Sequence, residues 1–209
     1  LTYLRNLESR KEEVIRLIDE QGKLDEDLKQ EILKSETLQR VEDLYRPYKQ
    51  KRRTRATVAK EKGLEPLSDI ILEQRMGQEE FEKVLISYLD EEKGVNTIED
   101  ALSGAMDIIA EFISDNPDYR QIIKRVVQKN GILSTAASDK EESSVYEMYY
   151  EYGEAIKSIA NHRILAINRG EKEKKLKVTI EINHEDIVEL LKTKVLNKDR
   201  YHLSVYVEN

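Results

Sequence analysis

Apolar residues recur every three or four positions along most of the chain, which is the spacing of one face of an amphipathic helix. The first such face carries Leu4, Leu7, Val14 and Ile18. We expect this helix to end at Gly22. A second helix should run from about Leu24 to Arg46, because Pro47 disfavours helical geometry in the residue before it. The two helices are predicted to form an antiparallel hairpin.

The same periodicity predicts further helices over residues 54–62, 66–74, 79–92, 97–114 and 117–130. Thr54 and Thr97 stand where a side-chain cap would begin two of them, and Thr97 is followed by Asp100 in the spacing of a capping box. Pro66 and Pro117 occupy the first turn, where a missing amide is tolerated. Residues 1–130 therefore read as a helical region, interrupted by an exposed loop at 46–53.

The pattern changes after residue 130. The segment STAASDKEESS is small and polar, so residues 131–145 are predicted to be a polar linker. Helical character should return over Tyr146–Arg169, and Leu176–Ile182 alternates like a strand. A short helix is expected over 186–195, and residues 201–209 fit either a strand or a helix. The predicted fold is mainly α, an array of helical hairpins with a small β element near 176–182, and residues 146–209 form a helix-strand-helix segment leading to further domains.

Composition supports a helical protein with a charged surface. Charged residues make up 37% of the 209, hydrophobic residues make up 39%, and there is no cysteine. Disulfides and thiolate metal sites are therefore excluded. The sequence has no apolar run of about 18 residues and no basic-then-apolar leader, so we expect a cytoplasmic protein with no membrane partner. The chain starts at Leu1 within an amphipathic pattern, and we expect it to be a piece of a longer protein.

Residues 46–62, RPYKQKRRTRATVAKEK, form a basic island in an otherwise acidic chain. The island contains eight Lys and Arg residues and one acid, a balance of 8 − 1 = +7. Since the whole chain carries −7, the remainder carries −7 − 7 = −14. A concentrated cationic segment is the part of such a protein that attracts a phosphate backbone. Nucleic acid is therefore the first partner to consider.

The predicted phosphate-binding residues are the cations at the start of the island: Arg46, Lys49, Lys51, Arg52, Arg53 and Arg55. Five phosphate contacts would give a log-log salt slope of about −3.5 on single strands and about −4.5 on duplex. No base-stacking aromatics are interleaved, which predicts weak sequence preference. The alternative is intramolecular: these cations could pair with the surrounding acids, order the loop and join two helical hairpins.

Other polar groups have simpler explanations. A second cationic group comprises Arg163, Arg169, Lys172, Lys174, Lys175 and Lys177. Glu171 and Glu173 reduce its local positive charge, and we interpret it as a solvated turn before the predicted strand. The tyrosines at 146, 149 and 150 are expected to pack rather than to stack on bases.

The sequence offers no motif for catalysis. The three histidines lie far apart without metal-ligand spacing, and no phosphate-binding loop or nucleophile motif is present. We therefore expect no enzymatic activity, no cofactor and no metal.

Three separated strings suggest a family: LYRPYKQKRRTRATVAKEKGLEPL, IEDALSGAMDIIAEFIS and NHRILAINRGEKEKKLKV. In this order they resemble the N-terminal part of bacterial Tex-type transcription accessory proteins, over essentially the whole chain. The resemblance implies a large cytoplasmic nucleic-acid-binding protein that continues into an RNase H-like domain, helix-hairpin-helix repeats and an OB-fold RNA-binding module. None of those modules is recognisable in this sequence.

Two functions follow as hypotheses. In the first, the chain contributes non-sequence-specific contacts to the phosphate backbone of RNA or DNA through the basic island, alongside the transcription machinery. In the second, it is a non-catalytic helical scaffold that docks the other domains of the same protein or a protein partner. Exposed apolar patches would favour the second hypothesis.

Overall fold

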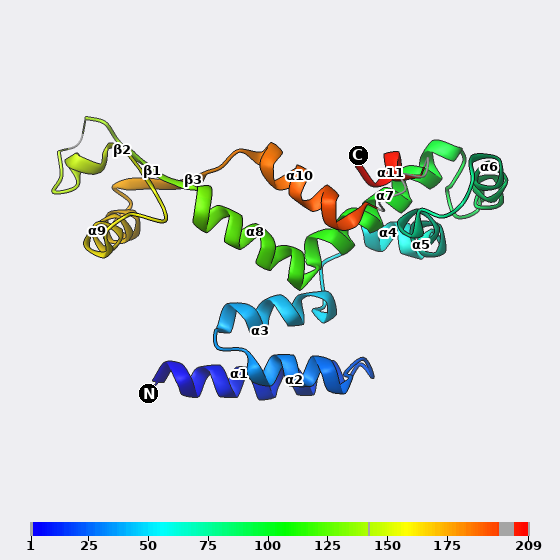
Figure 1. The fold of residues 1–209 in the computed structure, drawn as a ribbon, viewed down its shortest axis with the longest axis horizontal. Coiled ribbons are helices and arrows are strands. Elements are labelled where there is room, and N and C mark those ends of the chain that lie inside the picture. Colours follow the sequence, from blue (N-terminus) through cyan, green and yellow to red (C-terminus); the bar gives the residue numbers. More distant parts are fainter. Residues whose placement is uncertain (1, 142, 197–202, 209) are drawn as a thin grey trace. The chain divides into compact units, whose positions relative to one another are not determined.

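The structure is a computed structural model that describes residues 2–141, 143–196 and 203–208. Figure 1 labels its helices and strands. The chain divides into two compact units. The first unit runs to Arg120 and includes the C-terminal residues from Leu191, and the second unit comprises Gln121–Leu190. Two helices, α8 (Pro117–Asn130) and α10 (His184–Val195), contribute residues to both units.

The first unit begins with three packed helices, α1 (Thr2–Asp19), α2 (Glu26–Lys34) and α3 (Leu38–Tyr45). Their shared core contains Leu7, Val14, Ile18, Ile32, Val41, Leu44 and Tyr45. The single helix predicted over 24–46 is wrong, because the chain breaks between α2 and α3. Ser35 leaves helical geometry, and the Thr37 side chain accepts a hydrogen bond from the amide of Arg40 to begin α3. The apolar spacing continues across the break, which is why periodicity alone missed it.

Helix α7 (Ile98–Asp115) is the centre of the rest of this unit. It packs against α4 (Arg55–Glu61), α5 (Glu65–Glu73), α6 (Gln78–Ser87) and α11 (Ser204–Glu208). Small residues allow α4 and α7 to approach closely: a Cβ added at Gly104 of α7 would lie 3.3 Å from the Cβ atom of Ala59 of α4. The predicted caps Thr54 and Thr97 and the first-turn prolines Pro66 and Pro117 are confirmed.

Helix α6 is shorter than predicted. It ends at Ser87, and the chain then forms an isolated antiparallel bridge between Asp90 and Val95. The amide of each of these two residues donates to the carbonyl of the other, at 2.9 Å and 2.8 Å. The bridge satisfies backbone groups that a longer helix would have paired internally.

The second unit contains a three-stranded antiparallel sheet of β1 (Ile132–Ala137), β2 (Glu151–Ala155) and β3 (Leu176–Glu181), in the order β2-β1-β3. Helix α9 (Asn161–Lys172) covers one face of this sheet (Figure 1). Their common core is formed by Tyr146, Tyr149, Ile159, Ile167 and Leu176. The expected packing role of Tyr146 and Tyr149 is therefore confirmed, although Tyr149 ends a 3₁₀ turn (Glu147–Tyr149), Tyr146 directly precedes that turn, and neither lies on an α-helix face.

Two predictions for the second unit need correction. The polar linker predicted over 131–145 is wrong for residues 132–137, which form the central strand and pair with both neighbours. The helix predicted over 146–169 is wrong before Asn161, since residues 151–155 are strand β2. Both segments are short and lack a regular alternation of polar and apolar residues, so cross-strand pairing decides their conformation.

The predicted strand near 176–182 is confirmed as β3, and the helix over 186–195 lies within α10. Residues 201–209 were expected to form either a strand or a helix. Residues 204–208 are helical, and residues 201, 202 and 209 lie outside the described residues. The fold is mainly α with a small sheet, as the sequence predicted. Within the described residues, no helix combines the length and apolar character needed to cross a membrane.

Candidate nucleic-acid interface

The basic island begins in a short loop that is fixed at both ends. Pro47 lies in a 3₁₀ turn (Arg46–Tyr48) directly after α3, and the side-chain amide of Gln21 donates a 3.0 Å hydrogen bond to the carbonyl of Tyr48. Burial and the nearby charge of Asp25 raise the pKa of the Tyr48 phenol. At the other end, Thr54 caps α4, and its hydroxyl donates to the Glu111 carboxylate at 3.0 Å. The loop backbone is thereby held against the first unit.

Three acids of α7 face the island in a line. Asp107, Glu111 and Asp115 follow one another at four-residue intervals, which places them along one side of the helix. We call this set the acidic stripe. Asp115 is buried, and the other two are half-buried.

The acidic stripe pairs with three of the six predicted phosphate-binding cations. The Nε atom of Arg55 lies 3.3 Å from Oδ1 of Asp107. The Nζ atom of Lys51 lies 3.3 Å from Oε1 of Glu111 and also bonds Asp115. Arg46 joins the same Asp115 carboxylate. Three of the six cations therefore have intramolecular partners of the kind that the structural alternative predicts.

Two further island cations also have partners, and a third is paired only at the surface. Lys60 lies 2.9 Å from Glu65, and Lys62 donates a 2.8 Å hydrogen bond to the carbonyl of Gly94. Arg53 lies 2.7 Å from Glu61, with both side chains more than half exposed. An ion pair of that kind contributes little free energy, typically about 0–1 kcal/mol, so it leaves Arg53 available for another anion.

Lys49 and Arg52 differ from the rest of the island. Both side chains are exposed, and neither forms an ion pair with any carboxylate of residues 2–141, 143–196 and 203–208. They project from a loop that the paired cations fix on α7. The structure thus divides the six predicted residues into an anchoring set, Arg46 and Lys51, which pair with the buried Asp115, and an available set. The available set comprises Lys49 and Arg52 and, more weakly, Arg53 and Arg55, whose ion pairs lie at the surface.

A hollow of about 510 Å³ lies beside the acidic stripe, lined in part by Tyr48, Phe112 and Leu72. Its charged lining consists of two lysines, Lys51 and Lys60, and four carboxylates, Glu65, Asp69, Glu111 and Asp115. This balance repels phosphate. The loop surface is therefore a better candidate for a polyanion than the hollow.

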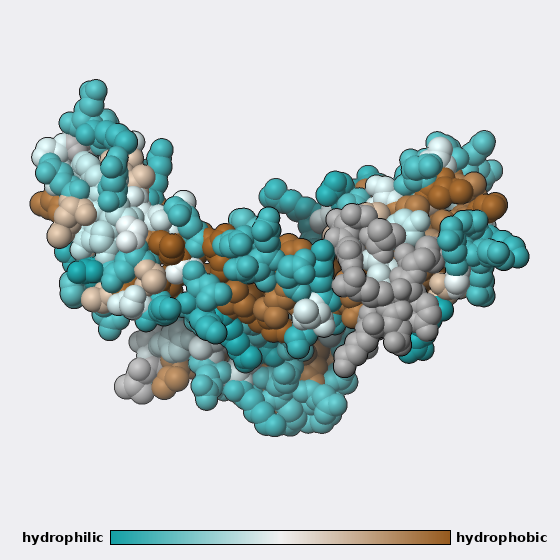
Figure 2. Space-filling view, turned by 45° about the horizontal axis from the view of Figure 1, so that its top comes forward, coloured by the Kyte–Doolittle hydropathy of each residue, from teal (hydrophilic) through white to brown (hydrophobic). Residues whose placement is uncertain are grey.

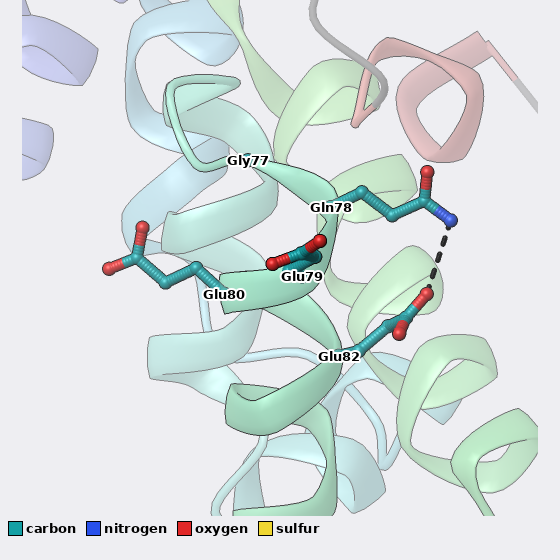
Figure 3. Close-up of a pocket in the computed structure, with 5 residues that line it drawn as sticks. All are labelled: Gly77, Gln78, Glu79, Glu80 and Glu82. Carbon is teal, nitrogen blue, oxygen red and sulfur yellow. Dashed lines mark hydrogen bonds between the residues drawn. The ribbon is translucent and has the colours of Figure 1, made fainter.

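A second, open hollow occurs at the start of α6, where Figure 3 shows Glu79, Glu80 and Glu82 pointing in different directions. The Gln78 amide donates a 3.1 Å hydrogen bond to Glu82. Glu79 and Glu80 lie in the first turn of α6, where the helix dipole stabilises acids without a ligand. The described residues contain no group of three or more metal-ligating side chains of the His, Cys, Asp and Glu types.

The second cationic group is divided by the fold. Arg163 lies 2.7 Å from Glu154, and hydrogen bonds from the Tyr152 hydroxyl and from Arg163 lower the pKa of that carboxylate. Arg169 and Lys172 lie at the end of α9, Lys174 and Lys175 lie in the turn that follows, and Lys177 lies on β3.

Comparison with known proteins decides the family. The family model described as Tex central region-like matches residues 78–204. The chain belongs to the Tex family. It is 52% identical over 197 residues to the uncharacterized protein YdcI of Bacillus subtilis, an alignment that covers 93% of this chain and 27% of that protein.

Two further relatives carry informative names. The Tex chain is 32% identical over 188 residues to the transcriptional accessory protein Tex of Neisseria gonorrhoeae, covering 89% of this chain and 24% of that protein. It is 29% identical over 193 residues to the human S1 RNA-binding domain-containing protein 1, covering 88% of this chain and 19% of that protein. The chain therefore spans about a quarter or less of the length of these relatives.

Proposed function

We propose that this Tex-family chain contributes non-sequence-specific contacts to the phosphate backbone of RNA or DNA during transcription, and that it does so in the cytoplasm through the loop of the basic island. The observation that carries this proposal is the pair of exposed cations, Lys49 and Arg52, on a loop that is fixed at both ends. The names of the gonococcal and human relatives support transcription and RNA as the context. The proposal assigns the chain a binding role and no catalytic step.

The mechanism is electrostatic. Lys49 and Arg52 would lie along phosphates and release counterions, and Arg53 would exchange its surface partner Glu61 for a phosphate oxygen. Arg46 and Lys51 would act as positioning residues, since their pairing with Asp115 holds the loop against α7. Phosphate contacts of this kind carry no base information, so the loop should not distinguish sequences.

The test is fluorescence anisotropy with a labelled single-stranded RNA and a labelled DNA duplex at about 50 and 200 mM salt. Changing Lys49→Gln and Arg52→Gln together should make the salt slope on single strands shallower by about 1.4, since two contacts are removed. The matched control is Lys23→Gln with Lys83→Gln, two exposed lysines of the same unit that have no ion pair in the described part of the chain. If the loop variant binds like the control variant, the loop is not a phosphate contact.

A docking scaffold remains a second candidate because of α8 and α10. Neither helix contains a fully buried residue, although α8 carries Ile122, Ile123, Val126 and Val127. In α10, Val188 is 46% exposed. Figure 2 shows hydrophobic surface along these two helices.

Hydrogen exchange tests this second candidate. The amides of α8 and α10 would be measured in this chain alone and in an intact Tex-family protein that contains it. Docking of other domains predicts slower exchange of both helices in the intact protein, and unchanged exchange would reject it.

A further inference from the structure

The turn that joins α9 to β3 displays cations that lack acidic partners. Arg169, Lys172, Lys174 and Lys177 are all exposed, and none forms an ion pair with a carboxylate in the part of the chain that the structure describes. We call these four residues the cationic turn. In the basic island, by contrast, most cations are already neutralised by named acids. The cationic turn has the lower total charge but more exposed cations that have no acidic partner in the described residues.

Lys174 has a backbone conformation that is unusual for lysine. Its φ is +58°, in the left-handed region. The amide of Lys174 donates to the carbonyl of Glu171, and the amide of Lys175 donates to that of Gly170, both at 2.9 Å. These two hydrogen bonds form a Schellman motif, in which the left-handed position normally holds glycine. Lysine is strained in this conformation, and its presence places a charged side chain on the turn.

The backbone of the turn is held in place by packing and by a hydrogen bond. Gly170 is buried against β3, and a Cβ at this position would lie 2.7 Å from Cδ1 of Leu176 and 3.2 Å from Cδ1 of Tyr146. Leu176 is itself buried, and the amide of Ser138 donates a 2.9 Å hydrogen bond to the carbonyl of Lys175. Because the backbone is already ordered, little entropy is lost there when a ligand binds.

Two acids oppose the cations within this stretch. Residues 169–177 contain five Lys and Arg residues and two Glu, a balance of 5 − 2 = +3. The Glu173 carboxylate is engaged by a hydrogen bond with the Tyr146 hydroxyl. Glu171 and Glu173 are both exposed, and each reduces the field of the cations by one charge. The net field remains attractive to an anion chain.

We propose that the cationic turn is a second binding site for the phosphodiester backbone of single-stranded nucleic acid. Lysine and arginine side chains that are free of acidic partners, and are held on an ordered turn and on the helix and strand that it joins, attract a chain of phosphates without reading its bases. The class of ligand rests on the proposed function, whereas the location rests on the second unit alone. Each site can therefore fail without the other.

The experiment uses the whole chain and a labelled single-stranded RNA, with a labelled single-stranded DNA as a second arm. The turn variant carries Lys172→Gln, Lys174→Gly and Lys177→Gln. The matched control carries Lys23→Gln, Lys34→Gln and Lys83→Gln, which removes the same charge from exposed lysines of the first unit. Anisotropy is measured from about 50 to 200 mM salt, together with the loop variant Lys49→Gln/Arg52→Gln.

Loss of three contacts should make the salt slope shallower by about 2.1, which reduces the effect of a fourfold rise in salt by roughly 18-fold. Lys174→Gly alone should make the slope shallower by about 0.7 without lowering the thermal midpoint, because glycine suits the left-handed position. This single variant keeps the test valid if the triple variant does not fold.

The outcomes separate the two sites. If the turn variant loses affinity and the loop variant does not, the second site stands and the loop assignment fails. If the turn variant and Lys174→Gly both bind like the lysine control, the cationic turn is overturned even if the loop variant is impaired. Absence of wild-type binding at about 50 mM salt overturns both sites.

Discussion

The Nε atom of Arg46 donates a 2.8 Å hydrogen bond to the Oδ1 atom of Asp115, although 69 residues separate them. Lys51 bonds the other carboxylate oxygen of the same residue. Asp115 is the last residue of α7, where the helix dipole disfavours a negative charge. Two cations of the basic island compensate for that position, so the end of α7 and the start of the island stabilise one another.

Replacement of Asp115 should therefore destabilise the first unit. Asp115→Ala removes a buried acceptor and leaves two cations without their shared partner, so we expect a loss of about 2 kcal/mol. The loss should stay below that of a fully buried pair, because the Arg46 side chain is 45% exposed and can be rehydrated. Urea unfolding measures the change.

Glu12→Ala is the control for this prediction. Glu12 is an exposed acid of α1, and its replacement should change stability by less than about 0.5 kcal/mol. Equal midpoints for the two variants would show that the Asp115 ion pairs contribute nothing to stability.

The capping box of α7 predicts a pH-dependent contribution. The Asp100 amide donates a 3.1 Å hydrogen bond to the Thr97 hydroxyl oxygen, and Oδ2 of Asp100 accepts from the amides of Asn96 and Thr97. Hydrogen bonds with the Thr97 side chain and with these two amides lower the pKa of Asp100 below its ordinary value of 3.8. Thr97→Ala should lower the free energy of unfolding by about 1 kcal/mol at neutral pH.

The sign of the pH effect follows from that lowered pKa. The contribution of Asp100 is fully present above pH 3.8 and is lost as the pH falls through the lower pKa of the folded state. Thermal midpoints of the wild type and Asp100→Asn, measured at intervals from neutral pH down to about pH 2, should therefore converge in the acid range. A constant difference between the two curves would show that ionisation of Asp100 does not support the cap.

The features predicted correctly from the sequence were those that depend on neighbouring residues. Thr54 and Thr97 cap their helices, and Pro66 and Pro117 open theirs, because each effect depends on residues within one turn. The strand over 132–137 could not be found in this way. Residues 134–137 are small and run into a polar segment, which resembles a linker. The conformation of the strand depends on pairing with β2 and β3, both distant in sequence.

The sequence located the basic island, but it could not show which of the island's cations form ion pairs. One signal was present: Asp107, Glu111 and Asp115 recur every four residues in a helix that is otherwise mostly apolar. The left-handed backbone of Lys174 gave no sequence signal, since glycine is the usual residue there and Glu171 and Glu173 conceal the local charge.

Neutralising part of the acidic stripe should strengthen nucleic-acid binding. Asp107→Asn with Glu111→Gln removes the partner of Arg55 and one of the two partners of Lys51, while the amide oxygen of Gln can still accept from Thr54. Each released cation that reaches a phosphate should steepen the single-strand salt slope by about 0.7. The control, Glu12→Gln with Glu36→Gln, makes the same change in net charge at exposed positions away from the stripe in sequence. Binding that increases only as much as in this control would mean that Arg55 and Lys51 serve the fold alone, and that phosphate contacts of the island are limited to Lys49, Arg52 and Arg53.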